Sequence, residues 1–360
     1  MKTITFVSAG LQKNGSVAMI LNLASLLSEK YIVKIVTHFD NAEYKLPLNI
    51  KYIFSDTVRQ GIFLKLYSKL KFIYQIYRQS TTSDLIICEE SASIAIITAQ
   101  ICALTNKPII IWNHSCRGEF IQTQGIINYL YKRSYQQATH TVNVSLYAQN
   151  CLLNFTNLNS SKISVIYNVI KTNNITNPNI LDLDNIQLIG IGALDKNKNF
   201  ELIINCLHQL KNKYNVKCTL TICGSGTYKT KLKELITKLG LGSYVVLYGI
   251  AQDVYPLISA SHILISASNS EAFPLTVAEA LSCNTPVIAT NTGASEILNS
   301  GDYGTIIEKD NLEQMTNAIL SIVNNYPQAK EKAILGNKSL SRFSEDKILP
   351  QWLELIERLT

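Results

Sequence analysis

Two acidic residues, Glu271 and Glu279, are separated by seven intervening residues where a predicted strand, residues 262–266, gives way to a helix. Pro274 is placed for the first turn of that helix. A carboxylate at a strand end can accept hydrogen bonds from sugar hydroxyls, and the N-terminus of the helix can hold phosphate. A second carboxylate about a turn and a half further on can bind a ribose diol. The pattern suits a sugar nucleotide, although two ordinary acids on a surface helix would have the same spacing.

A glycine-bearing loop follows the first predicted strand, residues 3–7. Gly10 and Gly15 let the backbone approach a bound group, and helix N-terminal amides favour an anion there. Ser16 stands where a P-loop needs lysine, so a nucleoside-triphosphate site of that type is excluded. The loop also lacks the Gly-x-Gly-x-x-Gly pattern of nicotinamide enzymes. A plain strand-to-helix turn is the alternative.

Apolar strands alternate with helical patterns along the chain, which predicts an α/β fold with parallel sheets covered by helices on both faces. The strands expected in the first half are residues 3–7, 32–37, 84–88, 108–112 and 141–145. Those expected in the second half are residues 186–191, 217–223, 244–247, 262–266 and 286–290. The helices expected in the first half are near residues 16–29, 62–78, 92–105 and 121–137.

The length of 360 residues exceeds what one hydrophobic core organises, so two domains are expected. We place the first domain at residues 1–171, an Asn-rich linker at 172–185 and the second domain at 186–343. A terminal helix, residues 344–358, interrupted or opened by Pro350, ends the chain, and residues 344–360 could pack back on the first domain.

Composition and charge narrow the class of protein. The chain is 47% hydrophobic with eight cysteines and no Cys-x-x-Cys pair, which indicates a globular protein with reduced thiols. No apolar run is long enough to span a bilayer or to form a signal peptide, so we expect a cytoplasmic location. Residues 1–171 hold 17 Lys and Arg against 8 Asp and Glu, whereas the remainder holds 16 against 18. The basic first half suggests an anionic partner such as a membrane surface.

Several motifs in order resemble the retaining glycosyltransferases of family four (glycosyl transferases group 1, of the bacterial surface-polysaccharide type). The match includes Glu271 and Glu279 in residues 268–290, Gly192 to Lys198, residues 220–226, and residues 247–249 before Asp253. It continues at residues 292–296 and, in the first half, at 144–145 and 165–168. The resemblance implies the GT-B fold, in which two Rossmann-like domains face each other across a cleft.

The resemblance also implies roles for individual residues. Glu271 would face the donor sugar, Glu279 the ribose and Lys198 the diphosphate, while His114 would lie near the reacting sugar. A structural role is the alternative for His114, which ends a predicted strand. The implied catalytic residues are Glu271, His114 and Lys198. The implied nucleotide-sugar site consists of Gly15, Gly192, Lys198, Gly224, Gly226, Glu271, Ala272, Phe273, Pro274, Leu275 and Glu279.

Two positions depart from the family pattern. Ala193 stands where the family usually has an arginine for the diphosphate, so Lys196 or a cation of the first domain replaces it, or phosphate binding is weaker. Asn284 replaces a glycine in a turn. Asp182 and Asp184 match the Asp-x-Asp pattern that holds a metal in another glycosyltransferase class, but they lie in the expected linker. We therefore expect no metal and no other cofactor.

The segment 59–78 combines an apolar helical stripe, Ile62, Leu66, Leu70, Ile73 and Tyr77, with several lysines. Lys65, Lys69 and Lys71 are the predicted membrane or acceptor contacts, because this composition is typical of a helix lying on anionic lipid. A core-packed helix with a solvated basic rim is the alternative.

Together these features predict a retaining glycosyltransferase that moves a hexosyl or N-acetylhexosaminyl group. The donor is a nucleoside-diphosphate sugar, with UDP-sugars favoured, and the acceptor is a glycan. The expected acceptor is a lipid-linked intermediate of O-antigen, capsule or lipopolysaccharide, reached from the inner face of the plasma membrane, with no nucleic acid involved. The alternatives are a GT-B epimerase or hydrolase of sugar nucleotides, and a non-catalytic sugar-nucleotide-binding membrane scaffold.

Overall fold

The computed structural model describes residues 1–12, 14–39, 42–44, 46–56, 62–116, 125–156, 158–172, 182 and 184–360. The chain forms two compact units, of which the first contains Met1–Val169 and Glu345–Thr360 and the second Ile170–Ser344. The predicted linker lies mostly outside the described residues, at 173–181 and 183.

The first unit contains a seven-stranded parallel sheet in the order β3-β2-β1-β4-β5-β6-β7. Its strands are β1 (Thr3–Ser8), β2 (Ile32–Phe39), β3 (Lys51–Asp56), β4 (Leu85–Glu89), β5 (Ile109–Asn113), β6 (His140–Asn143) and β7 (Ile163–Val165). The sequence did not predict β3 and β7. Both are edge strands, which are less enclosed than central ones and so lack the continuous apolar run that indicates a buried parallel strand.

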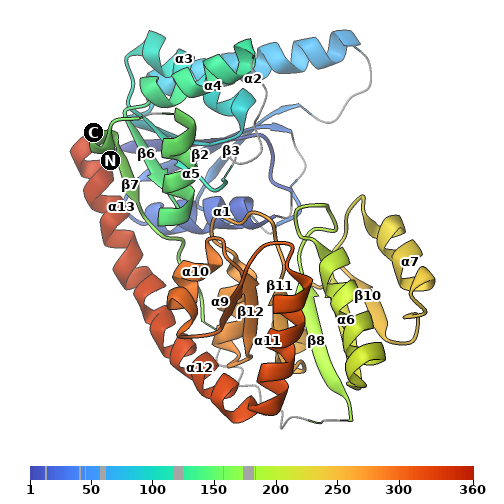
Figure 1. Ribbon diagram of the computed structural model, residues 1–360. Helices are drawn as coiled ribbons and strands as arrows, with labels where there is room; N and C mark the ends of the chain where they lie inside the picture. Colours follow the sequence, from blue (N-terminus) through green and yellow to red (C-terminus); the bar gives the residue numbers. More distant parts are fainter. Residues whose placement is uncertain are drawn as a thin grey trace. The chain divides into compact units, whose positions relative to one another are not determined.

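Helices cover both faces of this sheet (Figure 1). They are α1 (Gly15–Leu27), α2 (Ile62–Thr82), α3 (Ala92–Thr105), α4 (Ile126–Gln137), α5 (Leu146–Thr156) and α13 (Glu345–Leu359). Phe72 of α2 and Tyr131 of α4 share one core with Ile86 and Ile111 of the sheet. On the other face, Trp112 of β5 packs edge-on against Trp352 of α13, with 5.0 Å between ring centroids.

Helix α13 belongs to the first unit although it ends the chain. Glu357 accepts hydrogen bonds from Lys2 Nζ at 2.9 Å and from Tyr31 Oη at 2.7 Å, which places the two termini close together (Figure 1). The expected interruption at Pro350 is wrong, because the helix runs through this residue. Proline removes one backbone donor, and the buried Trp352 and Ile356 that follow keep the helix packed.

The second unit contains a six-stranded parallel sheet in the order β10-β9-β8-β11-β12-β13. Its strands are β8 (Ile186–Ile191), β9 (Cys218–Cys223), β10 (Val245–Gly249), β11 (Ile263–Ser266), β12 (Val287–Thr290) and β13 (Thr305–Ile307). Its helices are α6 (Phe200–Tyr214), α7 (Lys229–Lys238), α8 (Tyr255–Ser259), α9 (Leu275–Ser282), α10 (Ala294–Ile297), α11 (Leu312–Asn324) and α12 (Tyr326–Ser339). The predicted α/β class with two parallel sheets is confirmed. Among the described residues, no helix combines the length and the apolar character needed to cross a bilayer.

Candidate functional site

Apart from Gly15, which belongs to the first unit, the predicted nucleotide-sugar residues lie around the point where the strand order of the second sheet reverses. From β8 the chain adds β9 and β10 on one side, then returns to add β11, β12 and β13 on the other. The loops that follow β8 and β11 therefore diverge at the carboxyl edge, where open α/β sheets bind ligands. Lys198 lies after β8 and Glu271 after β11.

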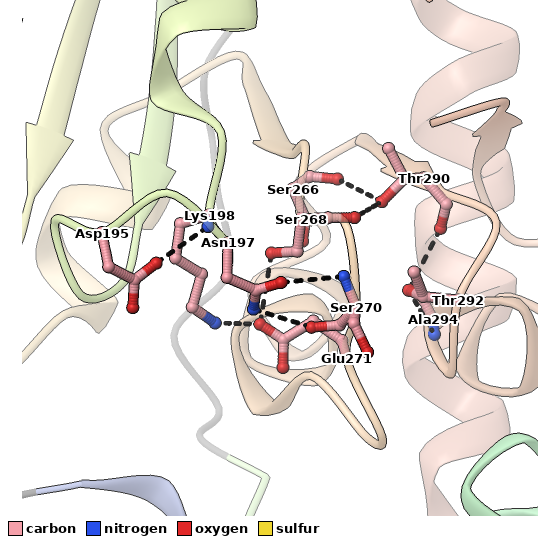
Figure 2. A network of polar contacts seen from close by, with 10 residues as sticks. All are labelled: Asp195, Asn197, Lys198, Ser266, Ser268, Ser270, Glu271, Thr290, Thr292 and Ala294. Atoms are coloured by element: carbon pink, nitrogen blue, oxygen red, sulfur yellow. Dashed lines mark hydrogen bonds and ion pairs between the residues drawn. The ribbon is translucent and has the colours of Figure 1, made fainter. Parts of the chain in front are cut away.

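Lys198 and Glu271 form an ion pair between Nζ and Oε1 (Figure 2). Their side chains are only 24% and 17% exposed, so water screens this pair less than an exposed one. Ser268 Oγ donates a second hydrogen bond to the same carboxylate oxygen at 3.2 Å. The backbone N–H of Lys198 donates to Asp195 Oδ1 at 3.0 Å, which fixes the loop that carries the lysine.

Asn197 joins the two loops, a role that the sequence analysis missed. Its Nδ2 donates to the Ser270 carbonyl at 2.9 Å, and its Oδ1 accepts from the Ser270 N–H at 3.0 Å (Figure 2). Its carbonyl accepts from the Asn269 N–H at 2.8 Å. Asn197, whose side-chain amide both donates and accepts, lies next to Lys198 in the sequence, but its partners are more than 70 residues away. Only the fold therefore identifies this function.

The loop that carries Glu271 is held from a third strand as well. The Gly293 N–H donates to the Glu271 carbonyl at 2.8 Å, and Thr290 Oγ1 donates to the Ser268 carbonyl at 2.5 Å. A Cβ on Gly293 would lie 1.9 Å from the Ala272 carbonyl oxygen, so only glycine allows this approach. Glu271 is thus placed by a rigid backbone rather than by a free loop.

Glycines after β8 and β9 bring two further loops into contact. Gly192 and Gly224 have φ of 156° and 151°, a region that L side chains rarely adopt. A Cβ on Gly224 would lie 1.8 Å from the Gly192 carbonyl oxygen, and one on Gly226 would lie 2.3 Å from that of Leu194. The three predicted glycines therefore allow the loops after β8 and β9 to pack backbone against backbone, beside Lys198.

Helix α9 begins at Leu275, one residue later than the sequence suggested, and Pro274 is its N-cap residue. Ala272 and Phe273 are buried, and Phe273 packs edge-on against Phe343 at 5.3 Å. Because these side chains face the core, a bound nucleotide would meet this segment through its backbone. Glu279 lies in the second turn of α9, and burial, with a smaller effect of nearby Asp253, raises its pKa to about 7.

In the first unit, Gly15 is the first residue of α1, and Asn14 caps that helix by accepting the Val17 N–H at 2.8 Å.

His114 follows β5, and its ring lies 4.3 Å from that of Trp112. Burial lowers the pKa of His114 to about 3, so the imidazole is neutral. Its Nε2 is shielded from solvent and has no hydrogen-bond partner among the described residues.

The remaining predicted residues lie away from the donor loops or outside the described part. Lys69 and Lys71 are exposed on α2, whereas the side chain of Lys65 is not among those described.

Asp184 pairs with Lys217 Nζ at 2.6 Å, just before the start of β8 and β9. This Asp-x-Asp segment therefore lies at the amino edge of the sheet, opposite to Glu271. Ala193 and Lys196, at the departure from the family pattern, are both exposed on the loop that follows β8.

Two family models match adjoining parts of the chain. Glycosyl transferases group 1 matches residues 172–339, and Glycosyltransferase Family 4 matches residues 13–174. The curated relatives include the N-acetylgalactosamine-N,N'-diacetylbacillosaminyl-diphospho-undecaprenol 4-alpha-N-acetylgalactosaminyltransferase of Campylobacter jejuni, which is 24% identical over 85% of this chain and 86% of the relative. The O-antigen chain mannosyltransferase RfbU of Salmonella typhimurium is 27% identical over 55% of this chain and 57% of the relative.

Solved structures share the whole fold. HepE of Anabaena in complex with UDP-glucose covers 100% of both chains with a TM-score of 0.82 and 18% identity. At 18% identity, this similarity supports a shared fold and nothing further.

Proposed function

Because this chain belongs to the group 1, family 4 glycosyltransferases with the GT-B fold, we propose that it moves a sugar from a nucleoside-diphosphate sugar to a glycan acceptor with retention of anomeric configuration. We favour a UDP-sugar as donor, since the HepE structure contains UDP-glucose. The proposed acceptor is a lipid-linked intermediate of O-antigen, capsule or lipopolysaccharide. The names of the Campylobacter and Salmonella relatives support this class.

The observation that carries the proposal is the Lys198–Glu271 pair at the switch point of the second sheet. A departing diphosphate needs positive charge beside it, and Lys198 supplies an ammonium that pairs with Glu271, on a loop that Asp195 fixes through the Lys198 backbone N–H. Glu271 offers a carboxylate to the hydroxyls of the donor sugar. In a retaining reaction of this type the leaving phosphate oxygen takes the proton of the acceptor hydroxyl. The protein then contributes positioning and charge stabilisation.

We further propose that α2 rests on an anionic membrane surface. Its buried side chains include Ser68, Phe72 and Ile76, whereas Leu66 and Leu70 are each 57% exposed. Tyr77, a third member of the predicted apolar stripe, is also exposed, as are Tyr67 and Tyr74 beside it. The side chain of Ile62 is not among those described, and Ile73 is half-buried.

The positive charge of the neighbouring helices also suits contact with an anionic membrane. Helix α3 packs between α2 and α4, and none of these three helices contains Asp or Glu. Helix α4 adds exposed Ile126, Ile127 and Tyr129 together with Lys132 and Arg133. A surface that combines apolar and aromatic side chains with positive charges, and has no acidic side chains, is typical of a protein face that lies at a lipid interface.

The experiment that tests the proposed reaction incubates the purified protein with UDP-glucose, UDP-galactose and their N-acetylamino counterparts. A donor that binds only the native state and is present at a concentration 100 times its Kd stabilises the protein by about 2.7 kcal/mol. A melting curve detects this stabilisation. Transfer to a lipid-linked glycan, with the donor's anomeric configuration kept in the product by NMR, is the expected result. Epimerised donor or free sugar alone would contradict a transferase, and binding without turnover would indicate a scaffold.

The same assay tests the proposed independence of metal. We expect transfer to continue at an unchanged rate after exhaustive chelation, because Lys198 and the helix dipoles would stabilise the diphosphate. Loss of transfer in chelator and its recovery with manganese or magnesium would contradict this proposal and restore Asp182 and Asp184 as candidates.

Glu279 provides a pH-dependent test of the ribose site. Its pKa of about 7 means that the carboxylate forms only as the pH rises through neutrality. If the charged form binds the ribose diol, the affinity for UDP should rise between pH 6 and pH 8, and Glu279→Gln should remove this dependence. Glu279→Ala should weaken UDP binding roughly tenfold or more, since a hydrogen bond to a charged group is lost. Calorimetry that finds parental affinity and pH dependence in both variants would refute the ribose assignment.

A further inference from the structure

A short segment far along the chain contacts the loop that carries Glu271. It is η4 (Leu340–Phe343), a 3-10 helix that precedes α13. Its Phe343 packs edge-on against Phe273, which lies two residues after Glu271, and both rings are buried. The Ile170 N–H donates to the Phe343 carbonyl at 2.9 Å, which joins η4 to the first residue of the second unit. Phe343 therefore has a fixed backbone as well as a buried ring.

Arg342 of η4 reaches the same loop by a second route, through α10. Its Nη2 donates to the carbonyls of Glu296 and Ile297 at 2.7 and 3.0 Å. These carbonyls lie at the C-terminal end of α10, where the last acceptors of a helix lack regular helical partners and basic side chains can bind them. At the other end of α10, its N-cap residue Gly293 donates to the Glu271 carbonyl at 2.8 Å. Helix α10 thus connects Arg342 to the backbone of Glu271.

The two routes meet within η4 itself. The Arg342 guanidinium lies 4.6 Å from the centroid of the Phe343 ring, a distance at which a cation and an aromatic ring attract each other. Arg342 is exposed, so its side chain can be removed without leaving a cavity in the core. The contacts of η4 use the Glu271 backbone and the Phe273 ring. The carboxylate of Glu271 is therefore left to Lys198 and to a ligand.

We propose that Arg342 and Phe343 are positioning residues, which hold the Glu271 carboxylate where sugar transfer needs it. This inference rests on the proposed transferase function. Catalysis by positioning is sensitive to small shifts, and a displacement of about 1 Å can slow a reaction roughly a hundredfold. Neither residue touches the substrate in this account, because η4 acts through Gly293 and Phe273. Loss of its contacts should therefore lower turnover more than nucleotide affinity.

Hydrogen exchange followed by NMR tests the proposal without donor or acceptor. The Ser270 N–H donates to Asn197 and the Gly293 N–H to the Glu271 carbonyl, so both amides report on opening of the loop. In Arg342→Ala we expect both to exchange roughly fivefold faster or more than in the parent, because weaker contacts make local opening more frequent. Lys338→Ala, which removes an exposed cation at the end of α12, is the matched control and should leave both rates unchanged.

Turnover provides the second measurement. Arg342→Ala should lower kcat roughly tenfold or more, while the donor KM and the UDP affinity stay near parental. In the Glu271→Gln background the same change should have little further effect, because the carboxylate that η4 positions is already absent. Phe343→Leu keeps an apolar side chain but lacks the aromatic edge, and should give a smaller loss of the same kind. Arg342→Lys, which keeps a cation, should restore part of the rate.

Four results would overturn the proposal. Parental exchange at Ser270 and Gly293 in Arg342→Ala is the first, and a parental kcat in that variant is the second. The third is a loss that multiplies with that of Glu271→Gln, since Arg342 would then act independently of the carboxylate. The fourth is a lower melting temperature with parental exchange and kcat, which would indicate a purely structural role. If the parent transfers no sugar, the proposed function fails, whereas faster exchange in Arg342→Ala still supports positioning of the loop by η4.

Discussion

Replacing Glu271 with glutamine is expected to slow sugar transfer roughly a hundredfold or more while the protein remains folded. The carboxylate lies beside Lys198 on a loop whose backbone is fixed by hydrogen bonds from Asn197, Gly293 and Thr290, so the position of the loop does not depend on the charge of Glu271. Glutamine keeps the shape but removes the charge that would stabilise the reacting sugar. A polar contact made in the transition state contributes a few kcal/mol. Steady-state rates with a UDP-sugar and a lipid-linked acceptor provide the measurement.

The matched control is Glu234→Gln, an exposed acid on α7 of the same unit, which should keep the parental rate. The melting temperature and UDP affinity of Glu271→Gln separate a catalytic effect from a folding effect. Since Glu279 and the glycine loops would hold the nucleotide, we expect UDP affinity to change much less than turnover. A variant that transfers sugar at a near-parental rate would remove Glu271 from the reaction centre.

The sequence predicted the central strands, and it singled out the loops of the candidate donor site, because both inferences depend on local patterns. Continuous apolar runs indicate buried parallel strands, and glycines directly after them indicate close backbone approach. The pair formed by Lys198 and Glu271 could be suspected from motif order. The structure adds that β8 and β11 are neighbours, which brings the two side chains into contact.

Features that depend on contacts between distant segments could not be predicted. The packing of Phe343 against Phe273 requires η4 to lie beside the Glu271 loop, although about 70 residues separate them in the sequence. Helix α2 illustrates a second limit, since a periodic pattern does not say which face meets the core. Ser68 is 4% exposed and Leu70 is 57% exposed, the reverse of what side-chain polarity alone would predict.

The second large effect is expected at the exposed apolar and basic surface of α2. Changing Lys65, Lys69 and Lys71 together to Glu should abolish binding to anionic vesicles. Each lysine near such a surface contributes about 1 kcal/mol, so losing three lowers the affinity by about 3 kcal/mol, or more than a hundredfold. The three new negative charges add repulsion. Sedimentation with vesicles of phosphatidylglycerol and phosphatidylcholine at two salt concentrations measures the effect, and parental binding should weaken as salt increases.

The matched control changes three exposed lysines of the second unit, Lys213, Lys233 and Lys238, to Glu. Both variants alter the net charge equally, so a difference between them reports on the α2 surface rather than on total charge. UDP-sugar binding should be parental in both, because the proposed donor residues Lys198, Glu271 and Glu279 are unchanged. If the α2 variant and the parent partition equally onto anionic vesicles, the exposed tyrosines and leucines of α2 do not face lipid. The basic charge of the first half would then have to serve a soluble anionic acceptor.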